Sequence, residues 1–324
     1  MTSMKVAIFG AFGTIGRAVA AELTRRGQQV RVVGRSDEKL RRAFGETVER
    51  VAADVADPEG CAAAAAGVDA IVYSLGLPYS RKAFAAYAPM MRLAVGAAKG
   101  SGVGRLVLIT NVYPYGLPQT PRVAESHPRV PASVKGQHRK EQENVVLAAH
   151  DPAGLRTLSL RLPDFYGPHA DLSLGNRIFE SALARQPAQL LGPIDTPHEF
   201  VFTPDVAPVV CDLLERADLF GDAYNFAGPA PITLRDFARN VYEAAGAPLK
   251  LRAAAPWLVK LLGLFSPLMR ELGEMSYLQT NPVLLDDSKL RSVLPVVRKT
   301  GYDEGIRRTL ATMSSGITSP ISGS

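Results

Sequence analysis

Three glycines lie where an apolar run gives way to a helical pattern: Gly10, Gly13 and Gly16 follow the segment Lys5–Phe9. Without Cβ atoms the backbone can turn tightly and approach a diphosphate, which free amides and the helix dipole attract. The succession of strand, glycines, helix and second strand therefore predicts a dinucleotide site. The residues expected around the diphosphate are Gly10, Phe12, Gly13, Thr14, Ile15 and Gly16.

The ends of the following strands supply groups for the rest of a dinucleotide. Arg35 and Ser36 stand where an NAD-preferring site usually carries an acid, so they favour a 2′-phosphate and hence NADP(H) over NAD(H). Asp37 keeps the NAD(H) alternative open, because it could turn inward to a plain ribose. Further along, Asp54 can accept a hydrogen bond from adenine or simply cap a turn, with Val55 beside it. Leu75 and Gly76 would let the nicotinamide half lie against the backbone.

Four side chains could handle a proton or hold a substrate. Tyr113 follows the fifth expected strand into the crevice at the carboxyl edge of a parallel sheet. Lys135 and Arg139 are one helical turn apart and would face the same side. His198 lies in a turn-rich loop. Each also has a structural interpretation: a space-filling loop tyrosine, two solvated helix cations and a satisfied loop histidine.

The alternation of β-branched runs with Ala-, Leu- and Arg-rich helical stretches predicts an α/β protein with a Rossmann-type doubly wound parallel sheet. Residues 1–162 would form the coenzyme-binding domain and 163–313 a smaller substrate-binding subdomain, with some elements returning to the first domain and 314–324 as a tail. The expected strands are Lys5–Phe9, Gln29–Val33, Val48–Ala52, Ala70–Tyr73, Arg105–Ile109 and Leu155–Leu160. The expected helices span 14–27, 36–43, 59–66, 81–100 and 132–149.

Composition narrows the function classes. The net charge of +6 is scattered along the chain, which argues against nucleic-acid binding. The two cysteines have no metal-binding spacing, and no ligand set predicts a metal site. No apolar run is long enough for a membrane span, so we expect a soluble, cytoplasmic protein. The apolar segment Pro256–Leu278, with Trp257, predicts a buried helical pair or a lid over the substrate.

The chain resembles the extended short-chain dehydrogenases/reductases, the epimerase/dehydratase-like group, and more closely its atypical members. The GxxGxxG spacing is that family's form, and the resemblance spans roughly residues 4–310. It continues in the motifs Ile109–Gly116, Arg161–Pro168, Thr203–Ala207 and Tyr224–Gly228. The resemblance implies that Tyr166 and His198 meet the substrate, that Asn111 replaces the family's carbonyl-polarising Ser or Thr, and that two copies could pair through 81–100 and 132–149.

The sequence departs from the family at the catalytic Tyr-x-x-x-Lys. The matching stretch reads Lys135-Gly136-Gln137-His138-Arg139, and the alternative register, Gly136 to Lys140, also lacks a tyrosine. Arg139, which is permanently charged, would then bind the ribose. Lys135 would carry a proton or hold the nicotinamide ribose, and Tyr113 becomes the better proton carrier.

These observations predict an NADP(H)-dependent oxidoreductase that transfers hydride to or from a small, partly apolar organic substrate. Tyr113, Lys135 and Asn111 would be catalytic, and Tyr166, His198 and Trp257 would contact the substrate. Two alternatives remain open: an epimerase, dehydratase or isomerase that uses bound nicotinamide transiently, and a non-catalytic NADP(H)-binding redox sensor.

Overall fold

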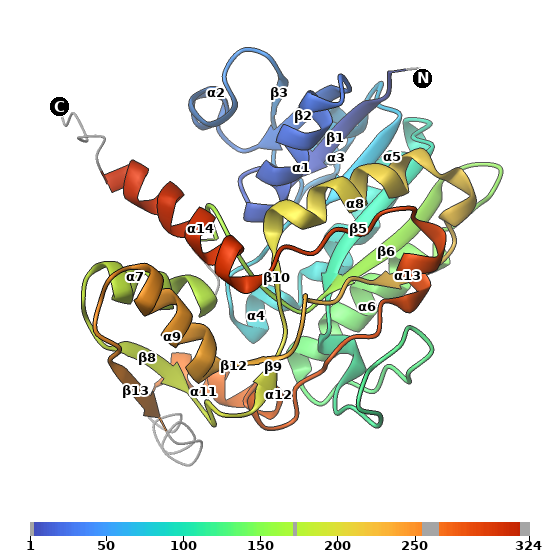
Figure 1. Ribbon diagram of the computed structural model, residues 1–324. Helices are drawn as coiled ribbons and strands as arrows, with labels where there is room; N and C mark the ends of the chain where they lie inside the picture. Colours follow the sequence, from blue (N-terminus) through green and yellow to red (C-terminus); the bar gives the residue numbers. More distant parts are fainter. Residues whose placement is uncertain (1–2, 171–173, 255–265, 318–324) are drawn as a thin grey trace.

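The computed structural model describes residues 3–170, 174–254 and 266–317. A parallel seven-stranded sheet, in the order β11-β6-β5-β4-β1-β2-β3, forms its centre (Figure 1). The strands are β1 Lys5–Phe9, β2 Gln29–Gly34, β3 Glu49–Ala52, β4 Ala70–Tyr73, β5 Arg105–Asn111, β6 Arg156–Leu162 and β11 Ala223–Asn225.

Both faces of the sheet are buried, as parallel sheets require. Along β1, Val6 and Ile8 pack into one core, while Ala7 and Phe9 pack into the other. The first core lies against α1 (Thr14–Arg25) and α8 (Thr203–Glu215). The second lies against α3 Pro58–Ala65, α5 Tyr87–Gly100 and α6 Val134–Ala148. The predicted Rossmann-type architecture is confirmed.

The expected helix 81–100 is two helices, α4 (Arg81–Phe84) and α5 (Tyr87–Gly100). Pro89 lies in the first turn of α5 and has no amide hydrogen to donate to the carbonyl of Ala85, which favours a break in the helix at this point. The remaining early helix, α2, spans Asp37–Phe44.

A smaller group of elements lies below the carboxyl edge of the sheet (Figure 1). It contains three two-stranded sheets, β7 with β10, β8 with β13 and β9 with β12. Its aromatic and aliphatic core lies against α7, α9 and α14. The bounds are β7 Asp164–Tyr166, α7 Leu174–Leu183, β8 Ala188–Leu191, β9 Pro197–His198, β10 Phe200–Phe202, β12 Ile232–Thr233, α9 Leu234–Ala244, β13 Leu251–Ala254, α11 Pro267–Glu274, α12 Tyr277–Thr280 and α14 Tyr302–Ile317. α13, Ser288–Val293, packs against β11 of the large sheet instead.

The chain crosses between the two parts more than once. β11 pairs with β6 at the end of the large sheet, and α8 packs against α1, so part of 163–313 belongs to the first domain. α14 continues to Ile317, into the segment expected to be a tail. Within the described residues, no helix is long and apolar enough to cross a membrane.

Candidate active site

The turn between β1 and α1 requires its glycines for steric reasons. Gly10 has φ +92°, and a Cβ there would lie 2.7 Å from the backbone of Leu75. A Cβ on Gly16 would overlap the carbonyl oxygen of Gly10. The turn is therefore closed tightly against the end of β4 and the first turn of α1, which leaves Gly13 at the helix N-terminus.

No side chain in the described part of the chain caps α1, whose N-cap is Gly13. By contrast, Ser36, Asp57 and Ser133 cap α2, α3 and α6. The hydroxyl of Thr14 is turned away, donating to the carbonyl of His169 at 2.7 Å. Free amides and a positive helix end remain available to an anion, so this turn fits the diphosphate of a dinucleotide.

Two charged residues follow the end of β2: Arg35, which is free to bind an anion, and Asp37, which is already paired. Arg35 is exposed and has no hydrogen bond or ion pair among the described residues. Asp37, the residue that kept NAD(H) open, pairs with Arg50 at 3.2 Å. The hydroxyl of Ser36 accepts from the amide of Lys39 at 3.3 Å, so it also serves as a helix cap. The arrangement leaves the Arg35 guanidinium available to a phosphate.

The other expected coenzyme contacts lie around this turn. Phe12 is half-buried against Gly34, and Ile15 is buried in the core below α1. Asp54 is exposed, and its Oδ1 accepts from the amide of Ala56 at 3.0 Å, with Val55 buried beside it. That turn bond leaves the second carboxylate oxygen for adenine. Leu75 and Gly76 follow β4 directly.

Tyr113 lies in a short 3₁₀ turn after β5, next to Asn111, whose Oδ1 accepts from the Tyr113 amide at 3.2 Å. Burial raises the pKa of the Tyr113 hydroxyl well above 10, and neighbouring Tyr79 and Asp164 raise it further. The charged neighbour that acts on this hydroxyl is a carboxylate, which opposes its ionisation. The phenol keeps its proton and is a hydrogen-bond donor.

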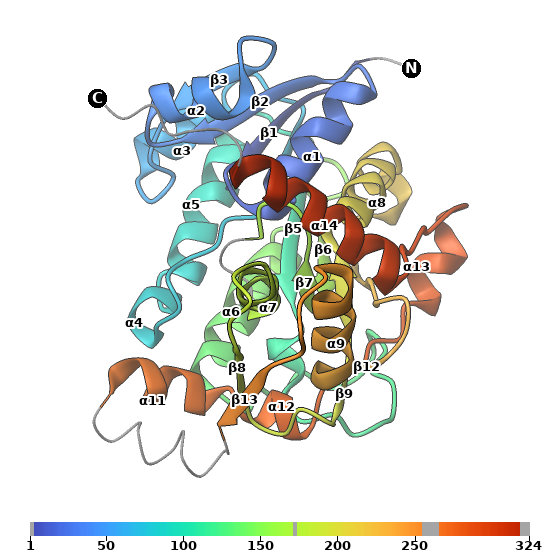
Figure 2. The ribbon, with the colours of Figure 1, turned by 60° about the vertical axis from the view of Figure 1, so that its left-hand side comes forward.

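Lys135 is fully buried, and its ammonium group binds to residues of α11. Its Nζ donates to the carbonyl of Glu271 at 3.0 Å and to Oε2 of Glu274 at 2.9 Å, and it pairs with the Glu271 carboxylate. The Glu274 carboxylate also binds Arg81 of α4 at 2.8 Å. Figure 2 shows α11 below α4 and α6. This lysine therefore fastens α11 to α6, which differs from the freely available proton carrier that the sequence suggested.

Arg139 points into the sheet one turn further along α6. Its guanidinium stacks on the ring of Tyr87 at 4.4 Å, and Nη2 donates to the hydroxyl of Thr110 at 3.0 Å. Its Nε is buried without a partner among the described residues. A buried cation with a spare donor beside β5 fits a role at the ribose.

A cavity of about 170 Å³ lies between α7, β8 and α11. Its wall is mainly apolar, from Ile178, Leu190, Leu191, Phe200, Leu234, Met269 and Leu272, with Asp164, Arg177, Gln189, His198 and Gln279 as polar members. His198 is one of the residues that line it. Tyr166 is not one of them: it is fully buried among Phe179, Phe202 and Phe237, because Gly305 leaves room for its ring in the core. Trp257 lies outside the described residues.

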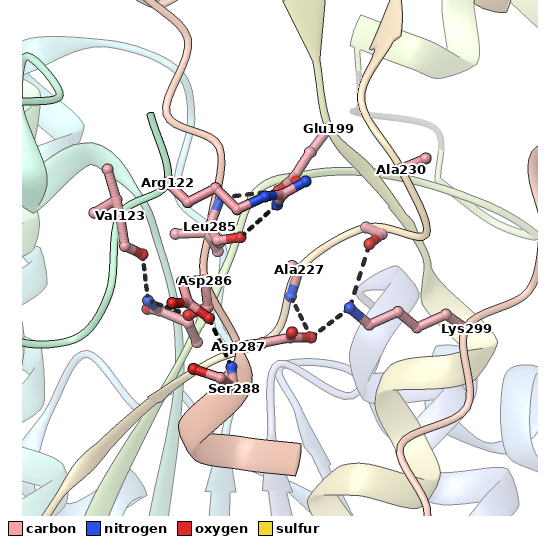
Figure 3. A network of polar contacts seen from close by, with 12 residues as sticks. Arg122, Val123, Glu199, Ala227, Ala230, Leu285, Asp286, Asp287, Ser288 and Lys299 are labelled. Carbon is pink, nitrogen blue, oxygen red and sulfur yellow. Dashed lines mark hydrogen bonds and ion pairs between the residues drawn. The ribbon is translucent and has the colours of Figure 1, made fainter. Parts of the chain in front are cut away.

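A network of ion pairs and hydrogen bonds surrounds Glu199, the residue that follows β9 (Figure 3). Glu199 is buried and accepts from Arg122 at 3.0 Å and from the amide of Leu285 at 3.0 Å. Asp287 nearby pairs with Lys299 at 2.5 Å and accepts from the amide of Ala227. Glu199 is thus a structural carboxylate whose charge is already paired.

Asp164 and Tyr79 are the site residues that the sequence analysis missed. Asp164 comes two residues after the end of β6, and an acid at the carboxyl end of a strand is the signal that could have found it. No comparable signal marks Tyr79. In the described ranges, no group of three or more His, Cys, Asp or Glu could hold a metal ion.

A parallel seven-stranded sheet with an uncapped glycine turn at its first helix defines an NAD(P)-binding Rossmann protein. Residues 10–149 match the NAD(P)H-binding family model. The chain is 26% identical over 344 residues to a 2-alkyl-3-oxoalkanoate reductase of Stenotrophomonas maltophilia, covering 96% of this chain and 100% of the relative.

Solved structures share the fold. A dTDP-glucose 4,6-dehydratase of Streptomyces venezuelae with NAD bound has a TM-score of 0.80 at 20% identity, covering 96% of this chain and 97% of that one. A UDP-glucose 4-epimerase of Thermotoga maritima has a TM-score of 0.81 at 16% identity, with 97% and 100% covered. The chain therefore shares the fold of these epimerase and dehydratase structures, and its residues 10–149 carry the NAD(P)H-binding match. It is an NAD(P)-binding enzyme of oxidoreductase type.

Proposed function

We propose that the protein is an NADP(H)-dependent oxidoreductase that interconverts a carbonyl and an alcohol on a small, partly apolar substrate. One combination of features carries the coenzyme assignment. The N-terminus of α1 has no side-chain cap, and the Arg35 side chain has no partner among the described residues, whereas Asp37 forms an ion pair with Arg50. Amides at Thr14 and Ile15 would bind the diphosphate, since the Gly13 amide already donates to the carbonyl of Gly10 at 3.0 Å. Arg35, with Ser36, would bind the 2′-phosphate, and Asp54 the adenine.

The chemistry divides between coenzyme and chain. The nicotinamide, when bound, supplies or accepts a hydride. Tyr113 would hold the substrate oxygen by donating a hydrogen bond, which its raised pKa favours. Asn111 would orient the turn that carries Tyr113, and Arg139 would hold the ribose. Lys135 would contribute by keeping α11 in place over the site.

The cavity wall supports a substrate with alkyl groups. Most of its lining is aliphatic or aromatic, and Arg177 on the rim has no ion pair among the described residues, so a carboxylate or ester head could bind there. Asp164 in the same wall would repel a nucleotide diphosphate. The relative's name, an oxoalkanoate reductase, describes such a substrate, and we propose the same class here. Pairing of two copies through α5 and α6 stays a prediction, which analytical ultracentrifugation tests.

Calorimetric titration with NADPH and with NADH tests the coenzyme assignment. We expect the protein to prefer NADPH and Arg35→Asp to lose at least about tenfold in NADPH affinity, since a charge-assisted phosphate contact is worth about 1.5–3 kcal/mol. Arg41→Asp, on the exposed side of α2, is the matched control and should leave the ratio unchanged. An Arg35→Asp variant with the wild-type preference would contradict the proposal.

A further inference from the structure

The Asp164 carboxylate lines two cavities and has no partner among the described residues. The residue follows Pro163 at the end of β6, and its backbone is fixed by the pairing of β7 with β10, where it lies opposite Phe200. Its side chain is accessible to water and lines two adjoining cavities, the apolar one and a smaller one beside Pro282 and Val283. It makes no hydrogen bond or ion pair with any described residue.

The groups that face Asp164 leave its charge uncompensated. Tyr79 and Tyr113 lie close enough for the carboxylate to raise the pKa of both hydroxyls. His198 lines both cavities, its Nε2 is buried without a partner in the described structure, and burial lowers its pKa to about 4, so the ring is neutral. Glu199 is paired with Arg122. Arg177 is the cation in the cavity wall, and it does not bond to Asp164.

We propose that Asp164 is the acid–base residue of the site, exchanging the proton of the substrate oxygen in place of the family's missing tyrosine. This inference rests on the proposed function. When the carbonyl carbon gains the hydride, the π electron pair moves to the oxygen. The oxygen then takes the proton from the Asp164 carboxyl, whose O–H electron pair stays on the carboxylate. Water in the cavity returns a proton, and Tyr113 keeps its own while holding the oxygen.

The environment suits this task. The Asp164 carboxyl opens onto the two cavities but is surrounded by protein, and this partial loss of solvent raises its pKa to about 6, close to neutral, where a general acid–base group is most effective. Reduction needs the protonated carboxyl, so its kcat/KM should be highest below pH 6 and fall about tenfold per unit above it. Oxidation needs the carboxylate, so its kcat/KM should rise up to about pH 6 and then level off. If Tyr113 alone supplied the proton, reduction would not change across this range.

The test follows NADPH-dependent reduction of ethyl 2-methyl-3-oxobutanoate from pH 5 to 8.5. Asp164→Asn should lower kcat/KM about a hundredfold, the lower end of general acid–base contributions, and should abolish the inflection near pH 6. Asp164→Glu keeps a carboxyl and should retain an inflection. Asp195→Asn, which removes an exposed carboxylate paired with Arg235, is the control and should match the wild type.

Two results would overturn the assignment, and they are distinguishable. An Asp164→Asn variant with the wild-type rate and pH profile would eliminate Asp164 as the acid–base residue while leaving the proposed function intact. A wild-type protein that turns over no NADPH with this ketoester would overturn the proposed function and this inference with it.

Discussion

Replacing Lys135 by Met separates its structural role from a catalytic one. The substitution keeps an unbranched stem close in length to that of lysine and removes the ammonium group. In the native protein that group is fully buried, and all three of its protons have acceptors on Glu271 and Glu274. Its loss leaves the carboxylate of Glu274, which is 5% exposed, with a missing partner.

The expected loss of stability depends on which partners Glu274 keeps after the substitution. Breaking a buried ion pair by removing one member costs about 3–5 kcal/mol. Glu274 keeps Arg81 at 2.8 Å and the amide of residue 135 at 3.1 Å, so the cost should lie at the lower end, at about 3 kcal/mol. Adding Glu274→Gln to Lys135→Met should restore part of it, since the unpaired charge is then gone.

Urea unfolding followed by circular dichroism measures this change. Lys140→Met, on the same helix at a half-exposed position, is the matched control and should change the unfolding free energy by less than about 0.5 kcal/mol. A Lys135→Met variant as stable as that control, but without NADPH-linked turnover, would refute the structural role and return Lys135 to the reaction.

The remaining predictions concern stability and pH. His198 has its pKa lowered to about 4, so between pH 6.5 and 4 the unfolded chain binds a proton that the folded protein does not bind, and the folded protein loses stability. His198→Phe should abolish up to about 3 kcal/mol of that loss. Equal slopes of unfolding free energy against pH for the two proteins would argue against this. Asp164 has its pKa raised to about 6, so its favourable contribution is complete below about pH 3.8 and is lost as the pH rises through 6. Asp164→Asn should therefore stabilise the protein at pH 7.5 by about 1 kcal/mol, a value reduced from the full effect of the pKa shift because solvent screens the charge. The gain should vanish by pH 4. A difference in thermal unfolding between the two proteins that does not change with pH would contradict this.

The first half of the fold was predictable because its signals are local. The glycines of the first turn, the strand that precedes them and the helix that follows lie within about 25 residues, and all three were predicted. The expected helix 81–100 failed at a local detail, the position of Pro89. The small subdomain was less predictable because its sheets are two-stranded and join distant segments, such as β8 and β13.

In the candidate site, too, the residues with local sequence signals could be predicted and those that depend on distant contacts could not. The proposed coenzyme residues follow strand ends that the sequence reveals, so their positions in the fold could be predicted. The environment of Lys135 depends on Glu271 and Glu274, some 136 and 139 residues further along the chain, and no sequence spacing indicates that contact. Asp164 acquires its chemistry from cavities that exist only after β7, α7 and the His198 loop have come together.

The proposed coenzyme site depends most on the α1 N-terminus as a binding site for the dinucleotide diphosphate. Gly13 has φ −66° and ψ 158°, a conformation that aspartate adopts readily as a helix cap. In Gly13→Asp the carboxylate would occupy the free amides and repel the diphosphate, while Gly13→Asn would cap the helix without the charge. Calorimetric titration with NADPH should show a loss of at least about a hundredfold in affinity for Gly13→Asp, from a repulsion of several kcal/mol, and a smaller loss for Gly13→Asn. A folded Gly13→Asp protein that binds NADPH as tightly as the wild type would contradict the central claim.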